Sequence, residues 1–122
     1  MESYKDLKVW QKGIELVKAV YLLCELLPDS EKFGLTSQIK RCSISVPSNI
    51  AEGWGRASSK NLSNFLKIAR GSLLELETQL YLCKELGFVR ESDLKLIEEM
   101  INEESKMLNS FIQKIEQKPK VN

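Results

Sequence analysis

Apolar residues recur three and four positions apart through most of this 122-residue chain, and this spacing is the strongest constraint on its fold. It is the period of an α-helix that buries one side, because 3.6 residues complete a helical turn. The clearest stripe alternates fours and threes without a break: Leu62, Leu66, Ala69, Leu73, Leu76, Leu80 and Cys83. Such a pattern favours helices packed against helices.

The same spacing predicts four helices in a single all-α domain covering residues 1–122. The expected helices cover residues 6–27, 33–56, 60–86 and 92–117. Pro28 and Gly87 are typical helix stops, Ser58 or Ser59 is the expected cap of the third helix, and Ser92 that of the fourth. Short connections between long helices imply antiparallel neighbours, so we predict an up-down-up-down four-helix bundle.

Two helices depart from a simple buried stripe. In the first, the apolar arc is wider than one stripe requires, which indicates a second packing surface. The set expected to be buried in that helix is Leu7, Trp10, Ile14, Val17, Tyr21 and Cys24. In the fourth helix, Glu104 interrupts the stripe, which predicts either a looser middle or a polar partner.

The segment SVPSNIAEGWGR, residues 45–56, contains a proline and two glycines. The helical spacing nevertheless continues through it: Leu35, Ile39, Cys42, Val46, Ile50 and Trp54. Val46 would be a poor cap for a new helix beginning at Pro47, so we predict one helix that is kinked at Pro47. The hydroxyls of Ser43 and Ser45 are expected to bond the carbonyl groups that the proline frees.

Polar residues of this segment share one helix face. Asn49, Glu52 and Arg56 are three and four positions apart, and they predict either a buried polar network or a partner site. Glu75 belongs to the same candidate set, because on the third helix it is expected to pair with Arg or Lys across a polar gap.

Two glycines are interpreted as sites of close packing. Glycine inside a helix costs about 1 kcal/mol relative to alanine, so a structural reason is expected for it. We expect another backbone to approach Gly71, which precedes Ser72, and Gly53 near the kink at Pro47. Phosphate binding by a glycine-rich loop is not favoured, because no strand precedes Gly71 and the P-loop pattern is absent.

The chain contains no histidine, which removes the commonest general base and most zinc and di-iron sites. A Ser-x-x-Lys pattern occurs at Ser37–Lys40 and Ser92–Lys95, about as often as chance predicts. We therefore expect no enzymatic activity, no metal and no cofactor.

The cysteines and the apolar runs indicate where such a protein resides. Cys24, Cys42 and Cys83 are odd in number, lack CxxC spacing and have apolar neighbours, so they are expected to be buried reduced thiols. The longest apolar run has six residues, far below the roughly 20 that span a bilayer. No signal peptide is expected at the N-terminus, so we predict a cytoplasmic protein without membrane contact.

The net charge is only +1, but residues 29–70 hold seven basic and three acidic side chains. Lysine and arginine on a polar helix face are the usual contacts to phosphate groups. The candidate nucleic-acid contacts are Lys40, Arg41, Arg56, Lys60, Lys67 and Arg70. An ordinary solvated helix face would have the same composition.

Three stretches resemble a known family: DLKVWQKGIEL at 6–16, LTSQIKRCSISVPSNIAEGWGR at 35–56 and FLKIARGSLLELETQL at 65–80. The chain resembles the 23S rRNA-intervening sequence proteins, also known simply as four-helix bundle proteins. The resemblance extends to about Val89, and the last helix matches only in character. It implies an antiparallel four-helix bundle that assembles into a ring, typically a pentamer, and it brings no enzymatic activity.

A related branch of that family is the accessory protein of diversity-generating retroelements, which resembles a ring that binds RNA and reverse transcriptase. The resemblance thus implies three partners: further copies of the chain, structured RNA, and a reverse-transcriptase-like protein. That branch is markedly basic, whereas the present chain is close to neutral.

Two functions follow as hypotheses. The first is a ring-forming RNA-binding or ribonucleoprotein adaptor, which requires the six basic candidates to cluster on one surface. It loses its physical support if they scatter or if neighbouring carboxylates neutralise them. The second is a protein–protein scaffold with no nucleic-acid affinity, supported by the near-neutral charge and the wide apolar arcs.

Overall fold

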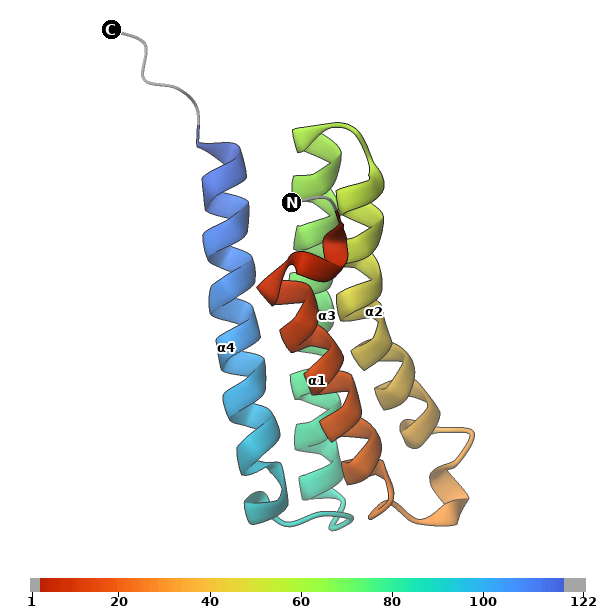
Figure 1. Cartoon of the computed structure of the whole chain (residues 1–122). Helices are drawn as coiled ribbons and strands as arrows, with labels where there is room; N and C mark the ends of the chain where they lie inside the picture. Colours follow the sequence, from red (N-terminus) through yellow and green to blue (C-terminus); the bar gives the residue numbers. More distant parts are fainter. Residues whose placement is uncertain (1–2, 118–122) are drawn as a thin grey trace, which may run out of the picture.

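The structure is a computed structural model that describes residues 3–117 (Figure 1). It contains four long helices: α1 (Lys8–Cys24), α2 (Leu35–Gly55), α3 (Ser59–Glu85) and α4 (Glu91–Glu116). Two single turns of 3-10 helix, η1 (Tyr4–Asp6) and η2 (Asp29–Glu31), precede α1 and α2. No strand occurs within residues 3–117, so the predicted all-α class with four helices is confirmed.

Each long helix contacts two of the others. α1 contacts α2 and α4, and α3 contacts the same two helices, so the four surround a common core. In Figure 1 the connections between successive helices lie at alternate ends of the bundle. One cluster of buried apolar side chains draws on all four helices. The α1–α2 side and the α3–α4 side therefore lie on opposite sides of the molecule.

α3 follows its sequence pattern closely. Six of the seven expected positions are buried, and Leu62 is half-buried. The Ser58 hydroxyl caps the helix by accepting a hydrogen bond from the Asn61 backbone N–H at 3.1 Å. At the other end Gly87 has a φ of 78°, a left-handed conformation that favours glycine. The Phe88 N–H then bonds the Cys83 carbonyl at 2.9 Å, which completes a Schellman-type stop.

Near α1, Leu7 and Cys24 are buried as expected, but between them the buried stripe lies one position away from the predicted one. The buried residues are Val9, Gly13, Leu16, Val20, Leu23 and Cys24. Of the expected set, Trp10, Ile14 and Val17 are half-buried and Tyr21 is exposed. The reason is Gly13. Because this residue has no side chain, α2 can approach α1 there: a Cβ on Gly13 would lie 3.4 Å from the Pro47 Cβ. A pattern that counts only large apolar residues does not detect this glycine.

The start of α4 also differs from the expectation. The cap residue is Arg90 rather than Ser92, and the helix begins at Glu91. The Asp93 carboxylate accepts the Arg90 backbone N–H at 2.8 Å, and this bond keeps the pKa of Asp93 below its ordinary value. Asp93 thus bonds the backbone of the cap residue, and Ser92 lies inside the first turn of the helix.

α2 continues through the buried Pro47 as one helix. The Ser43 hydroxyl donates to the Lys40 carbonyl and the Ser45 hydroxyl to the Cys42 carbonyl, both at 2.8 Å. Pro47 has no N–H to bond the Ser43 carbonyl, and neither hydroxyl bonds that carbonyl in its place. The expected role of these hydroxyls is therefore wrong in detail. The bend at Pro47 stays a prediction.

Candidate functional site

The six basic candidates do not gather on one surface. The Lys40 ammonium lies 4.7 Å from the centroid of the Tyr21 ring, on the α1–α2 side of the bundle. Lys67 and Arg70 instead contact α4, on the opposite side. The spacing that placed them together in the sequence does not determine which neighbouring helix each side chain meets.

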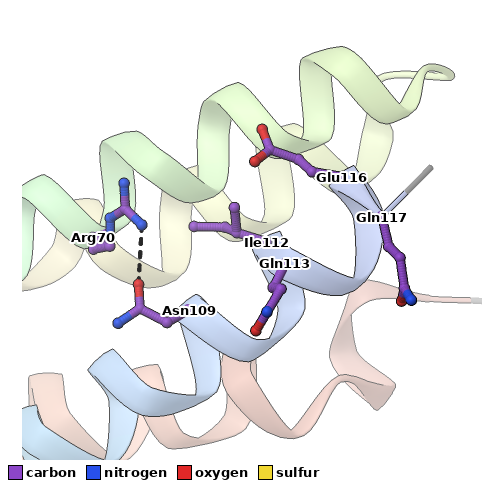
Figure 2. Close-up of a pocket in the computed structure, with 6 residues that line it drawn as sticks. All are labelled: Arg70, Asn109, Ile112, Gln113, Glu116 and Gln117. Carbon is purple, nitrogen blue, oxygen red and sulfur yellow. Dashed lines mark hydrogen bonds between the residues drawn. The ribbon is translucent and has the colours of Figure 1, made fainter.

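Lys67 and Arg70 are engaged across the α3–α4 contact. Lys67 Nζ lies 2.6 Å from Glu116 Oε2, which also accepts the Ser63 hydroxyl at 2.7 Å. These hydrogen bonds hold the pKa of Glu116 below its ordinary value. Figure 2 shows Arg70 reaching from α3 to the side-chain oxygen of Asn109 on α4, at 3.0 Å. Both cations thus join two helices while they stay accessible to solvent.

The remaining basic candidates divide into paired and unpaired residues. Arg56 forms an ion pair of 2.9 Å with Glu52 and lies 5.2 Å from the centroid of the Phe65 ring. Arg41 and Lys60 are exposed and form no ion pair within residues 3–117. The proposed basic surface is therefore reduced to two separated side chains.

The four residues predicted to form a polar network or a partner site make separate hydrogen bonds, each within one helix and its cap residue. Glu52 bonds Arg56, while the Asn49 amide donates to the Ser45 carbonyl at 2.7 Å. Glu75 accepts from Gln79 at 3.3 Å and forms no ion pair with Lys or Arg in the described part of the chain. The four candidates Asn49, Glu52, Arg56 and Glu75 thus share no network.

The two candidate glycines have opposite environments. A Cβ on Gly53 would lie 2.7 Å from the Phe65 Cβ and 3.3 Å from the Leu62 carbonyl oxygen, so α2 and α3 approach closely there. Gly71 is exposed, and no atom of the described chain lies within 4 Å of the position of its Cβ. No helix of the described chain therefore approaches Gly71, and a close approach by another copy stays a prediction.

The cysteines are free and buried. Burial and, after it, the Glu75 carboxylate raise the pKa of the Cys42 thiol to about 12. Burial is also the main cause that raises the pKa of Cys83 to about 11. Such thiols are poor nucleophiles. Within residues 3–117 no group of three His, Cys, Asp or Glu side chains is arranged to hold a metal ion.

Glu104 is the most unusual polar residue of the core. It is only 1% exposed, and neither carboxyl oxygen has a hydrogen-bond partner among residues 3–117. Burial, followed by the nearby Glu103, raises its pKa to about 8, while Lys12 acts in the opposite direction. The interrupted stripe of α4 indicated this position, but it did not predict a buried carboxyl without a partner.

A second feature not predicted from the sequence is the apolar outer face of α3. The exposed residues that define this α3 face are Ile68, Leu74, Tyr81, Leu82 and Leu86. At 3.6 residues per turn they fall within about 140° of the helix circumference, an arc that also holds the exposed Lys67, Glu75, Thr78 and Glu85.

The fold and these surfaces define an all-helical bundle protein whose described residues carry no metal-binding cluster. The chain belongs to the 23S rRNA-intervening sequence protein family, because the model of that family matches residues 5–110. The family resemblance expected from the three sequence stretches is thereby confirmed.

A solved structure gives a similar result. The chain is 27% identical to a protein of unknown function from the S23 ribosomal protein family of Bacteroides thetaiotaomicron. The match has a TM-score of 0.79 and covers 86% of this chain and 98% of the other. Neither match names an enzymatic activity, and no curated protein matches the sequence. None of the helices within the described residues is long and apolar enough to cross a membrane.

Proposed function

We propose that this protein is a non-enzymatic assembly protein whose copies join through the α3 face and act as a protein–protein scaffold. The observation that carries the proposal is the exposure of four large apolar side chains on α3 and of Leu86 directly after it, each between 44% and 64% exposed. Grouped apolar side chains of this size mark interaction sites on soluble proteins. The partner is a further copy of the chain, and a ring of five is the assembly that the family resemblance implies.

The charges of the molecule support assembly over nucleic-acid binding. Lys67 and Arg56 are paired with carboxylates, Arg70 bonds Asn109, and Lys40 faces α1. A scaffold needs no basic surface, and a net charge of +1 creates no overall positive field that would attract nucleic acid. The three free cysteines favour a reducing compartment, so we place the assembly in the cytoplasm.

The test is the molar mass in solution, measured by light scattering over a range of concentrations. Wild type is expected to be a multimer, and the double variant Leu74→Glu/Leu82→Glu a monomer with unchanged helicity, since both residues are exposed. The matched control is Ile44→Glu/Leu96→Glu on α2 and α4, which should keep the multimer. Its side chains are 41% and 63% exposed, against 44% for Leu82 and 64% for Leu74. A monomeric wild type, or a double variant that keeps its mass, would refute the proposal.

An RNA adaptor is the second candidate, and one observation favours it. Lys60 lies in an open groove between the start of α3 and the end of α4, together with Ser59, Asn64 and the Glu116 carboxylate that accepts the Ser63 hydroxyl. Hydroxyl, amide and ammonium groups are typical phosphate contacts. Structured RNA, or a reverse-transcriptase-like protein that carries it, would be the partner of this surface.

A further inference from the structure

The first helix of the bundle, α1, is much shorter than the fourth, α4. α1 has 17 residues and α4 has 26, which correspond to lengths of about 25 Å and 39 Å at 1.5 Å per residue. Ahead of α1 the chain turns away as η1, which contacts α1 and α2 but not α4. Figure 1 shows α1 beginning well below the C-terminal end of α4. The last turns of α4 therefore have no α1 segment beside them.

An apolar groove of about 810 Å³ lies at this place. Its floor is formed by Met107, Phe111 and Ile115 of α4 and by Trp54 of α2, all half-buried against the core. The three α4 residues are four positions apart, so they form one straight row about 12 Å long. This row continues the side of α4 that contacts α1 in the rest of the bundle.

The rim of the groove is basic. Lys8 of α1 and Lys106 and Lys114 of α4 line it, and all three are exposed. Within residues 3–117 none of them forms an ion pair or a side-chain hydrogen bond, and none of the described residues that line the groove carries a carboxylate. An apolar floor between unpaired lysines is complementary to a segment with one apolar stripe flanked by carboxylates.

We propose that this groove binds an acidic amphipathic helix of a partner protein, which takes the position that a longer α1 would occupy. A helix of three to four turns would place apolar side chains at i, i+4 and i+7 on the row of Met107, Phe111 and Ile115. Its carboxylates would then face Lys8 on one side and Lys106 and Lys114 on the other. The groove lies between α1, α2 and α4, away from the α3 face, so the two surfaces can be occupied independently.

The test uses two labelled synthetic helical peptides of about 14 residues that share one leucine stripe. Glutamate flanks the stripe in one peptide and lysine in the other. Fluorescence anisotropy should show that wild type binds only the acidic peptide. The variant Lys106→Glu/Lys114→Glu should lose at least about tenfold in affinity for it and gain affinity for the basic peptide.

The matched control is Lys32→Glu/Lys95→Glu, which makes the same change in net charge at exposed lysines outside the groove and should bind like wild type. Circular dichroism verifies the fold of each variant. Two results would overturn the proposal: no binding of the acidic peptide to wild type, or equal binding to wild type and Lys106→Glu/Lys114→Glu. A multimer that dissociates in Lys106→Glu/Lys114→Glu would also overturn it, because a second copy would then occupy the groove.

Discussion

Glu104 Oε2 lies 3.0 Å from the position that a Cβ on Gly13 would occupy. A carboxyl group of α4 therefore fills the space that a side chain on α1 would otherwise take. The Pro47 Cβ lies 3.4 Å from the same position, so residues of three helices meet at this glycine. The burial of Glu104 and the absence of a side chain at residue 13 thus depend on each other.

The first prediction concerns pH. In the unfolded chain Glu104 titrates near its ordinary pKa of about 4.3, whereas in the folded protein its pKa is about 8. Between these values the folded state keeps a proton that the unfolded chain releases. The free energy of unfolding should therefore fall as pH rises, by up to about 1.4 kcal/mol per pH unit.

Urea unfolding of wild type and Glu104→Gln at pH 5, 6, 7 and 8 measures this dependence. The glutamine variant should lack most of this pH dependence. Because the chain has no histidine, few other groups titrate between pH 5 and 8. Parallel pH profiles for the two proteins would mean that the Glu104 carboxyl is not buried in solution.

The second prediction compares two glycines. Gly71→Ala should raise the free energy of unfolding by about 0.5–1 kcal/mol, because it relieves the entropic cost of a helical glycine at an open position. Gly53→Ala should lower it by about 1–3 kcal/mol, because the new Cβ would lie 2.7 Å from the Phe65 Cβ. Chemical denaturation of the two variants checks both signs. Destabilisation by Gly71→Ala would instead place that glycine in an interface between copies.

The third prediction concerns the proline of α2. Pro47→Ala restores the missing N–H donor to the helix, so the variant should fold, with a straighter α2 and an altered assembly. A crystal structure of the variant and its molar mass in solution are the measurements. If both helix geometry and mass equal those of wild type, Pro47 has no role in shaping α2.

The fourth prediction separates the two candidate functions. An assembly protein without a basic surface should not bind a labelled structured RNA even at about 50 mM salt. An RNA adaptor would bind it, with a logarithm of affinity that falls linearly with the logarithm of salt concentration. Binding that is lost in Lys60→Glu/Lys67→Glu/Arg70→Glu, with helicity retained, would therefore favour the adaptor.

The sequence predicts best where one helix face decides the outcome. The prediction for α3 is correct because its core positions are spaced four and three residues apart in strict alternation. In α1 several sides are apolar, and the side that is buried depends on Gly13. The start of α4 is less predictable. Its cap residue is Arg90, whose N–H bonds Asp93, and the local sequence pattern does not distinguish this start from one capped by Ser92. The start and end of each helix agree with the expectation to within a few residues.

The surfaces were less predictable, for a geometric reason. Sequence spacing places Lys67 and Arg70 on one side of α3, but only the bundle shows that this side meets Asn109 and Glu116 of α4. The groove beside α4 depends on where α1 begins. It could not be inferred from the residues that line it, which come from three different helices.

The buried thiols have a practical consequence. Cys24, Cys42 and Cys83 lie on three different helices, and their raised pKa values keep them protonated and unreactive while the bundle is closed. An alkylating reagent should therefore modify each of them slowly, and faster when the helices around it open. Mass spectrometry of the modified chain would then give separate opening rates for α1, α2 and α3 without any introduced label.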